Sequence, residues 1–454
     1  MPNFQSAQIA RAAKGRWHSG EPERIGGFCF DTRRIESGDC FVALRSETRD
    51  GHDFIEEAAR KGASCALAER PMKTGIPQLV VDDTLSALGA IAANHRLSFN
   101  HPVVAITGSC GKTSTKEMLR LLLGADKTLA TAGNWNNRIG VPMTLFGLDP
   151  NDQEFAVIEA GINQPGEMAL LGEMIRADLT ILTNIGPAHL ERLGSLEGIA
   201  VEKSKLAEMA KGSAPLVLPA EALQYPAYAK MADRCIALHF DASERVPQVR
   251  RAVECRIESA PDGATHNIRL EGQNYRIATS SHGIAQNAGL ALVAALELGL
   301  PAQVLAERIA AWVPEATRGR TVQMDDGFSY IDCYNANPAS MRDALQAFQR
   351  ISKPDLNRCY ILGAMNELGK DERAMHLAIG KSLLLRQQDR ALLIGPAHLT
   401  EAYLQGCLQA GAMAGQIECF ETTEAARSSV AQFKGAFFLK GSRSYQLESL
   451  LSHR

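Results

Sequence analysis

The chain has 454 residues, 45% of them apolar, and a formal net charge of −3; it is long enough for about three globular domains and lacks the basic excess of nucleic-acid-binding proteins. Its ten cysteines form no CxxC pair, which argues against a zinc site or redox dithiol and predicts reduced thiols in a cytoplasmic setting. Region 1–30 lacks the apolar core of a signal peptide, and no stretch reaches the roughly 20 apolar residues of a membrane-spanning helix.

The N-terminal region alternates short apolar runs with turns. We predict strands within 26–30, 39–44, 64–68 and 78–83, a helix within 53–62 and a second helix over 85–99. This pattern is typical of a small mixed α/β unit. We place that domain at residues 1–84.

The middle region has longer units in which strands alternate with helices. We predict strands at 103–107, 155–160, 179–184 and 216–218, and a closing helix at 284–299. Such alternation favours a mostly parallel sheet with crossover helices. Pro314 and Gly319 interrupt the pattern, so this domain is placed at residues 85–313.

The last region repeats the alternation. We predict strands at 328–333, 360–364, 391–395 and 436–440, separated by helices. This favours a doubly wound, Rossmann-like domain at residues 314–454. The predicted fold class is therefore α/β in three domains, the central one of P-loop type.

The segment "VVAITGSCGKTSTKEM" follows a strand pattern and opens a helix pattern, as a phosphate-binding turn requires. Gly108 and Gly111 remove side chains where backbone N–H groups approach phosphate, Lys112 supplies a cation, and the Thr113 hydroxyl can ligate Mg²⁺. The predicted ATP-binding turn comprises Gly108, Ser109, Cys110, Gly111, Lys112, Thr113 and Ser114. The alternative is an ordinary turn with a surface lysine, since Ile106 occupies the position of the usual first glycine.

The string "TGSCGKTS" followed by "KEM" resembles the turn of the Mur ligase family and its folylpolyglutamate synthetase relatives, in which the loop is shorter at its start. The resemblance continues through "DTRR", "DGHDFIEEA", "GNWNNRIGVPMTL", "GPAHLERLGS", "EKSK", "DCYNANP" and "LKGSRS". It implies an ATP-dependent ligase that joins D-alanyl-D-alanine to a UDP-N-acetylmuramoyl tripeptide through an acyl phosphate, in peptidoglycan precursor synthesis. The pairing of "YNANP" with "KGSRS" is the most specific part.

The resemblance also implies a magnesium set and the catalytic residues Lys112, His189 and Lys203. Glu159 ends a strand pattern, where a carboxylate points into the ligand crevice of a doubly wound sheet and can hold Mg²⁺, although a turn role is the alternative. His189 is implied as a second metal ligand and Lys203 as a lysine that carries CO₂; the alternatives are surface residues. Lys205, two residues further on, is the competing lysine.

The nucleotide and closing-domain contacts are likewise implied by the resemblance. The adenine, ribose and phosphate set comprises Asn287, Arg320, Asp332, Tyr334, Asn335 and Asn337. Lys440, Ser442 and Arg443 are implied to meet the phosphates or the incoming dipeptide. Ala364 stands where relatives have an acid, which leaves that acid's role open in this chain.

The uridine end is implied to lie on the N-terminal domain. The contact residues are Thr32, Arg33, Asp50, Gly51 and His52, with Asn134, Asn136 and Asn137 facing the sugar-peptide chain. Asparagine clusters are also ordinary loop makers. Trp135 replaces a leucine that is usual between these asparagines.

Three alternatives remain open from the sequence. A sister ligase adding a single amino acid would share the middle region, a P-loop switch or motor would share the turn, and a folate polyglutamylase would lack the "DTRR…DGHDF" unit. We expect a cytoplasmic monomer that uses ATP and Mg²⁺, with a carbamylated Lys203.

Overall fold

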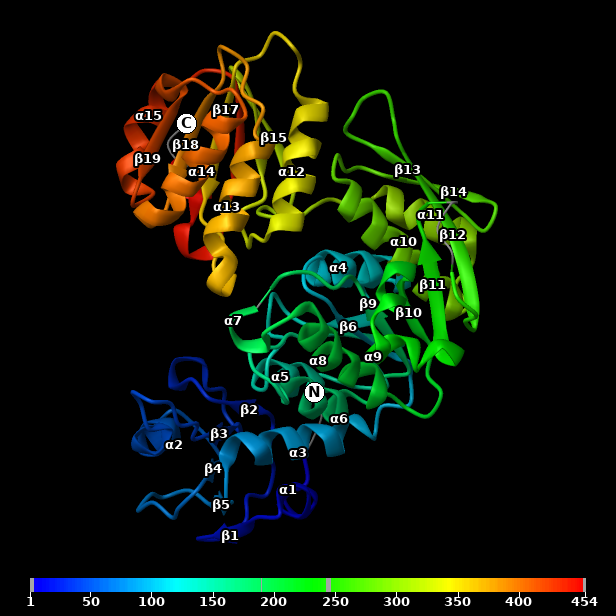
Figure 1. The fold of residues 1–454 in the computed structure, drawn as a ribbon. Helices are drawn as coiled ribbons and strands as arrows, with labels where there is room; N and C mark the ends of the chain where they lie inside the picture. Colours follow the sequence, from blue (N-terminus) through cyan, green and yellow to red (C-terminus); the bar gives the residue numbers. More distant parts are fainter. Residues whose placement is uncertain (1–3, 189, 242–245, 452–454) are drawn as a thin grey trace. The chain divides into compact units, whose positions relative to one another are not determined.

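The structure, a computed structural model, describes residues 4–188, 190–241 and 246–451. Contacts divide the chain into two compact units, which are described separately below. The first comprises Met1–Thr107, Leu123–Thr180 and Glu202–Pro215, and the second Gly108–Leu122, Ile181–Val201 and Leu216–Arg454. The strands form a five-stranded, a nine-stranded and a six-stranded sheet, and the α/β class predicted from the sequence is confirmed (Figure 1).

The five-stranded sheet has the order β1-β5-β4-β3-β2, in which only β1 is antiparallel to its neighbour. Its strands are β1 (Arg16–His18), β2 (Phe28–Cys29), β3 (Cys40–Val42), β4 (Cys65–Ala68) and β5 (Gln78–Val80). Its helices are α1 (Ser6–Ala13), α2 (Ile55–Arg60) and α3 (Thr84–Arg96). Phe41 and Ala66 pack with Ile55 and Ala58 of α2, because alternate strand residues share one face.

Helix α3 begins where the sequence predicted a helix. The Asp83 side chain caps it by accepting from the Ser86 N–H at 2.7 Å. At its end, the buried Arg96 guanidinium donates to the Ile175 and Phe99 carbonyls and pairs with Asp178 at 3.0 Å. These bonds fix the helix end within the first unit, because a buried guanidinium is stable only when its donors are satisfied.

The nine-stranded sheet has the order β14-β13-β12-β11-β10-β9-β6-β8-β7. Its strands are β6 (Val103–Thr107), β7 (Thr128–Ala130), β8 (Phe155–Glu159), β9 (Leu179–Leu182), β10 (Leu216–Pro219), β11 (Cys235–His239), β12 (Arg251–Ser259), β13 (His266–Leu270) and β14 (Gln273–Ile277). The helices of this part are α4 (Lys112–Leu123), α5 (Gly140–Leu145), α6 (Glu167–Ile175), α7 (Leu190–Leu193), α8 (Leu196–Glu208), α9 (Pro226–Ala229), α10 (His282–Glu297) and α11 (Ala302–Ala310).

Five strands of this sheet were not predicted, namely β7, β11 and the last three, β12, β13 and β14. β12, β13 and β14 form an antiparallel meander, whereas β6 and β7 each run parallel to β8, and β11 runs parallel to β10 and to β12. The alternating burial of β12, β13 and β14 is visible in the sequence as alternating apolar and polar residues. That signal marked the antiparallel meander at one end of the sheet.

The six-stranded sheet has the order β15-β16-β20-β17-β18-β19, with only the β15–β16 pair antiparallel. Its elements are β15 (Arg320–Met324), β16 (Gly327–Ile331), α12 (Pro338–Ile351), β17 (Arg358–Gly363), α13 (Glu372–Ser382), β18 (Arg390–Ile394), α14 (Ala397–Gln409), β19 (Ile417–Phe420), α15 (Arg427–Gln432) and β20 (Ala436–Lys440). Tyr360 and Leu362 pack with residues of α12, α13 and α14, which lie together in Figure 1. Cys359 and Ile361 pack on the other face with α15. Both faces are covered, as in a doubly wound sheet.

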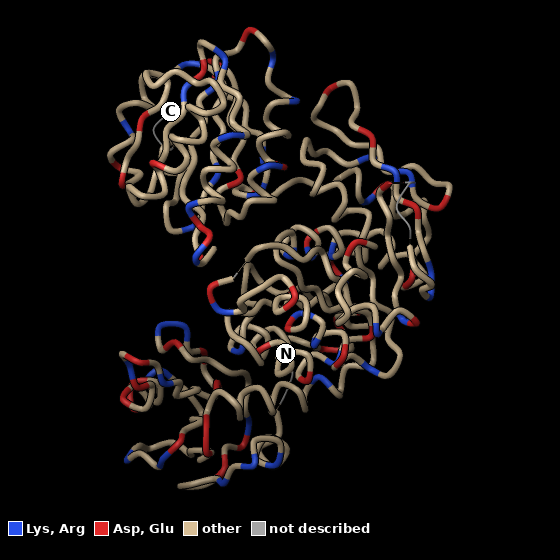
Figure 2. Tube along the Cα trace, viewed as in Figure 1, with Lys and Arg blue, Asp and Glu red and all other residues tan. Residues whose placement is uncertain are grey.

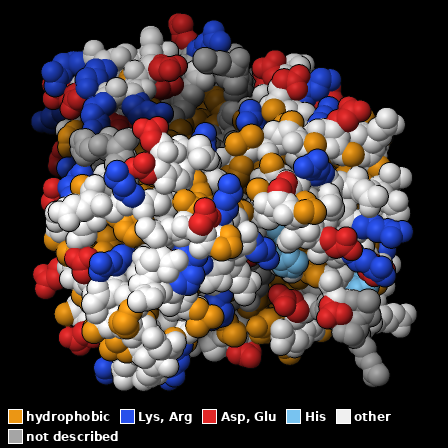
Figure 3. Space-filling model, turned by 90° about the horizontal axis from the view of Figure 1, so that it is seen from above, with side chains coloured by type: hydrophobic (Ala, Val, Ile, Leu, Met, Phe, Trp, Pro, Cys, Tyr) orange, Lys and Arg blue, Asp and Glu red, His pale blue; other side chains and the backbone are white. Residues whose placement is uncertain are grey.

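The surface mixes charges of both signs. Acidic and basic residues are interspersed along the tube in Figure 2, and on the face drawn in Figure 3 the hydrophobic side chains lie in small groups among polar and charged ones. Within the described residues, no helix combines the length and apolar character needed to cross a membrane.

Candidate nucleotide, metal and substrate sites

The turn between β6 and α4 is fixed by the segment that follows β9. The Ser109 N–H donates to the Asn184 carbonyl at 3.1 Å and the Cys110 N–H to Asn184 Oδ1 at 3.1 Å, while the Thr183 hydroxyl donates to the Cys110 carbonyl at 2.5 Å. Lys112 Nζ folds back to the Gly108 carbonyl at 2.9 Å. The turn is thereby preorganised at the N-terminus of α4, where the helix dipole favours phosphate.

Cys110 is the unusual residue of this turn. Burial raises the pKa of its thiol, and the nearby Asn184 side chain, whose Nδ2 lies 3.0 Å from Sγ, only partly opposes that shift. A thiol with a raised pKa is a weak nucleophile at neutral pH. The raised pKa favours the protonated thiol of Cys110, and its predicted ATP contact stays a prediction.

Asn287 of α10 packs directly on the turn. It is 7% exposed, and a Cβ added to Gly111 would lie 2.3 Å from its Nδ2. Gly111 also has φ +79°, a region that side chains avoid. Glycine is required here for both reasons, and the predicted adenine contact and the predicted phosphate turn lie side by side in the second unit.

Two predicted C-terminal motifs also meet in the second unit. The Lys440 side chain is 1% exposed, and its Nζ lies 2.5 Å from Asp332 Oδ2 and 3.2 Å from the Asn335 carbonyl. The meeting follows from the sheet, because Ile331 and Leu439 are partners in the parallel β16–β20 pair. The predicted ribose carboxylate is thus held by a cation from "LKGSRS".

The other residues of these motifs have varied surroundings. Asn337 caps α12 by accepting from the Ser340 N–H at 2.9 Å. Tyr334 is covered by the guanidinium of Arg318, 3.8 Å from the ring centroid, whereas Arg320 is exposed. Arg318 was missed from the sequence, although its place next to the "RGR" glycine marked the same turn. The nucleotide roles of Asn337, Tyr334 and Arg320 stay predictions.

The loop after β20 packs on the loop after β17. Ser442 is buried, its N–H donates to the Ala364 carbonyl at 3.2 Å, and its hydroxyl accepts from the Asn366 N–H at 2.9 Å. Arg443 pairs with Glu448 at the surface. Ala364 is fully buried, and a Cβ added to Gly395 would lie 2.8 Å from the Cβ of Ala364. The residue that replaces the usual acid is therefore closely packed.

Glu159 closes β8 as a buried carboxylate in the first unit. Its N–H donates to the Thr131 hydroxyl at 2.9 Å, and its Oε1 accepts from Asn136 Nδ2 at 2.7 Å. The residue is 1% exposed. A carboxylate oxygen at this strand end suits Mg²⁺, which prefers oxygen ligands.

The two competing lysines of α8 differ in burial. Lys203 is 2% exposed, whereas the Lys205 side chain is 34% exposed and pairs with Glu208 at 2.8 Å. Desolvation eases loss of the ammonium proton, which CO₂ addition requires, so Lys203 fits the predicted carbamate better. The predicted ligand His189 lies outside the described residues, among which no group of three His, Cys, Asp or Glu side chains is arranged for a metal.

The predicted uridine turns are held by their own side chains. Asp31 accepts from the Arg33 N–H at 3.0 Å and pairs with its guanidinium at 2.7 Å, which lowers the pKa of Asp31 to about 2. The Thr32 hydroxyl donates to Glu57 at 2.9 Å. The Arg33 side chain is exposed, so its guanidinium is accessible to an anion at this turn.

The second predicted uridine turn is held together by the buried His52 and the half-buried Asp50. His52 Nε2 accepts from the Glu69 N–H at 2.8 Å, so Nδ1–H donates to Asp50 at 2.6 Å. The Arg70 guanidinium and the His52 backbone and ring hold the pKa of Asp50 well below its usual range. A Cβ added to Gly51 would lie 2.5 Å from the Leu44 carbonyl. These residues support the turn, and direct substrate contact by them stays a prediction.

The asparagines of "GNWNN" separate into different roles. Asn134 is exposed, Asn136 binds Glu159, and Asn137 Oδ1 accepts from the Ile139 and Gly140 N–H groups at 3.1 and 2.9 Å. Asn137 therefore shapes the start of α5. A bond between Asn136 and a predicted metal ligand was not foreseen.

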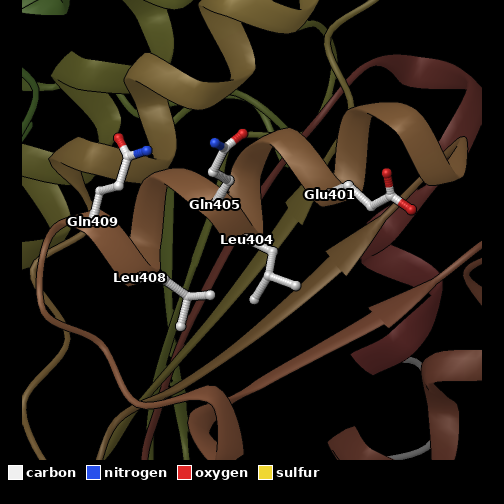
Figure 4. A pocket seen from close by; sticks show the side chains of 5 residues that line it. All are labelled: Glu401, Leu404, Gln405, Leu408 and Gln409. Carbon is white, nitrogen blue, oxygen red and sulfur yellow. The ribbon is translucent and has the colours of Figure 1, made fainter.

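A surface hollow lies elsewhere, along α14 (Figure 4). It is lined by Glu401, Leu404, Gln405, Leu408 and Gln409. None of the predicted site residues lines it, and one carboxylate among neutral side chains offers no catalytic set.

Comparison with known protein families finds three matching domains. "Mur ligase family, catalytic domain" matches residues 24–96, "Mur ligase middle domain" matches 106–295, and "Mur ligase, glutamate ligase domain" matches 317–443.

Individual proteins are similar over most of their length. A UDP-N-acetylmuramoyl-tripeptide–D-alanyl-D-alanine ligase of Synechocystis is 32% identical over 394 residues, 85% of this chain and 83% of that protein. A crystal structure of MurF from Acinetobacter baumannii has a TM-score of 0.86 at 29% identity, covering 100% of this chain and 98% of that one. The MurF ligase of Thermotoga maritima in complex with ADP shares the fold, with a TM-score of 0.79 at 24% identity over 93% and 96% of the two chains.

Proposed function

This chain belongs to the Mur ligase family, and we propose that it is an ATP-dependent ligase that joins D-alanyl-D-alanine to a UDP-N-acetylmuramoyl tripeptide in the synthesis of peptidoglycan precursors. The substrates are those named by the similar Synechocystis ligase. The main structural support for ATP use is the preorganised turn at residues 108–113, on which Asn287 packs against Gly111.

The reaction must first convert an inert carboxylate. The terminal carboxylate of the tripeptide attacks the γ-phosphorus of ATP, which forms an acyl phosphate and releases ADP. The amine of D-alanyl-D-alanine then attacks the acyl carbon, phosphate leaves, and the nitrogen loses a proton. Lys112 stabilises the charge on the transferring phosphoryl group, as a fixed cation beside the turn can do.

Magnesium is assigned to oxygen-bearing residues as a prediction. The set is Thr113, Glu159, His189 and carbamylated Lys203. When bound, Mg²⁺ screens the repulsion between phosphate and carboxylate oxygens. The buried Glu159 carboxylate and buried Lys203 amine are supporting observations.

The domain assignment follows the same proposal. Residues 1–84 bind the UDP-sugar, residues 85–313 bind ATP, and residues 314–454 contact the nucleotide and the dipeptide. The Arg33 guanidinium, with 84% of its side chain exposed, supports an anion contact on the first domain. We expect the protein to act as a monomer in the cytoplasm, which light scattering and fractionation test.

The direct test is product detection by mass spectrometry. Purified protein receives UDP-N-acetylmuramoyl tripeptide, ATP, Mg²⁺ and either D-alanyl-D-alanine or single amino acids. With the dipeptide, we expect the wild-type protein to form a UDP-N-acetylmuramoyl pentapeptide and ADP. The Lys112→Met variant should form neither product. Ligation of a single amino acid in preference to the dipeptide would point to a sister ligase, and ligation without ATP consumption would refute the mechanism.

A further inference from the structure

Residues 133–137, here called the asparagine loop, lie against the end of β8 in the first unit. Asn136 Nδ2 donates to Glu159 Oε1 at 2.7 Å across 23 residues of sequence. The Glu159 N–H is held separately by the Thr131 hydroxyl at 2.9 Å. The Thr131 bond thus fixes the backbone that carries the side chain, and the asparagine loop binds the carboxylate itself.

Asn136 is itself closely held. Its carbonyl accepts from the Gly161 N–H at 2.9 Å, and a Cβ added to Gly161 would lie 2.8 Å from the Asn136 amide. A Cβ added to Gly140 would lie 2.3 Å from the Trp135 carbonyl carbon. The loop fits between two positions where the chain has no side chain, so the amide has little freedom to turn away.

Trp135 connects the same loop to the Asp31–Arg34 turn. Its ring centroid lies 6.0 Å from that of Phe30, and the Arg34 guanidinium lies 5.7 Å from the ring centroid. Aromatic pairs and cation–π contacts of this kind are stabilising. The loop is therefore anchored at the residue next to Asn136.

We propose that Asn136 is a positioning residue for the metal: its amide fixes the Glu159 carboxylate in the orientation that Mg²⁺ requires. The proposal rests on the proposed function, in which Glu159 is a magnesium ligand. Hydrogen bonds that orient ligating carboxylates are worth 10–100-fold in metal affinity. The sequence assigned Asn136 to the sugar-peptide chain, so the two roles make different predictions.

The test is a Mn²⁺ titration of the full-length protein, followed by electron paramagnetic resonance in the presence of AMPPNP. Asn136→Leu keeps the branched shape of the side chain without a donor but is bulkier, and Asn136→Ser gives a smaller side chain that avoids crowding Gly161. Glu159→Gln is the reference for loss of the ligand. Asn100→Ala, which removes an exposed amide from the same unit, is the matched control. Circular dichroism verifies folding, and the result is taken from whichever Asn136 variant folds as the wild type does.

We expect the Asn136 variants to bind Mn²⁺ about 10–100-fold more weakly than wild type, Glu159→Gln to be at least as impaired, and Asn100→Ala to match wild type. Wild-type Mn²⁺ affinity in a folded Asn136 variant overturns the positioning role. If that variant instead shows only a raised KM for the UDP-muramoyl tripeptide, Asn136 contacts substrate. If Glu159→Gln binds Mn²⁺ as wild type does, it is the metal assignment that fails.

Discussion

The packing of Asn287 on the phosphate turn makes a quantitative prediction for Gly111→Ala. Gly111 has φ +79°, and its added Cβ would lie 2.3 Å from Asn287 Nδ2. Gly272, in the turn between β13 and β14, has φ +80° and no atom within 4 Å of an added Cβ. Gly272→Ala therefore carries the same backbone strain without the collision.

The two contributions can be separated by this pair. A left-handed backbone costs a residue with a side chain about 1–2 kcal/mol, and overpacking costs about 1–3 kcal/mol. Gly272→Ala should lose only the first amount. Gly111→Ala should lose both, about 2–5 kcal/mol, unless the turn moves off Asn287 to relieve the contact.

Relief by movement would appear in nucleotide binding. If the displaced turn must return before ATP binds, the 1–3 kcal/mol of overpacking becomes about a 5- to 150-fold rise in the Kd for MgATP. Urea unfolding and isothermal titration calorimetry measure the two quantities on wild type and both variants. The reasoning is refuted if Gly111→Ala matches Gly272→Ala in both unfolding free energy and Kd.

Two further predictions concern buried groups that lie next to the strands of the six-stranded sheet. Asp389→Ala should destabilise the protein by about 3–5 kcal/mol, because the buried Asp389 carboxylate accepts two bonds from Arg358, at 3.0 and 2.5 Å, and its loss leaves a buried cation unpaired. In urea unfolding, the control Glu424→Ala, which breaks an exposed ion pair, should change stability by less than about 0.5 kcal/mol. Equal losses of stability in the two variants would contradict this prediction. Burial holds the pKa of His376 below its usual value, and its Nε2 accepts from the Met365 N–H at 2.9 Å, so the unfolded chain binds this proton at higher pH than the folded one. The unfolding free energy should then fall as pH drops below about 6.5, and His376→Gln should reduce that slope by up to about 1.4 kcal/mol per pH unit; an unchanged slope between pH 5 and 7 would argue against a neutral histidine.

The fold class could be predicted from the sequence because each strand and helix has its own local pattern of apolar residues. The strands at 103–107 and 436–440 were predicted with the bounds that the structure gives, since buried parallel strands are continuous apolar runs. The antiparallel meander β12–β14 was missed although its residues alternate. Strands with one exposed face contain fewer apolar residues, so a search for continuous apolar runs overlooks them.

The sequence predicted the roles of single residues less well than the positions of helices and strands. Nothing in the sequence distinguished Lys203 from Lys205 except the resemblance, whereas burial separates them at once. Asn337 and His52 were predicted to bind ligands, and the structure gives each a hydrogen-bonding role within the protein. A polar side chain in a motif can serve either purpose, and only its partners tell them apart.

The sequence alone was enough to predict a phosphate-binding turn, because strand, glycines, lysine and helix are contiguous. Only the tertiary structure decided that Asn287 packs on Gly111, that Lys440 holds Asp332 across 108 residues, and that Asn136 orients Glu159 across 23. These contacts form between residues that sheet pairing and loop packing bring together. No local periodicity encodes which distant side chain will be the partner.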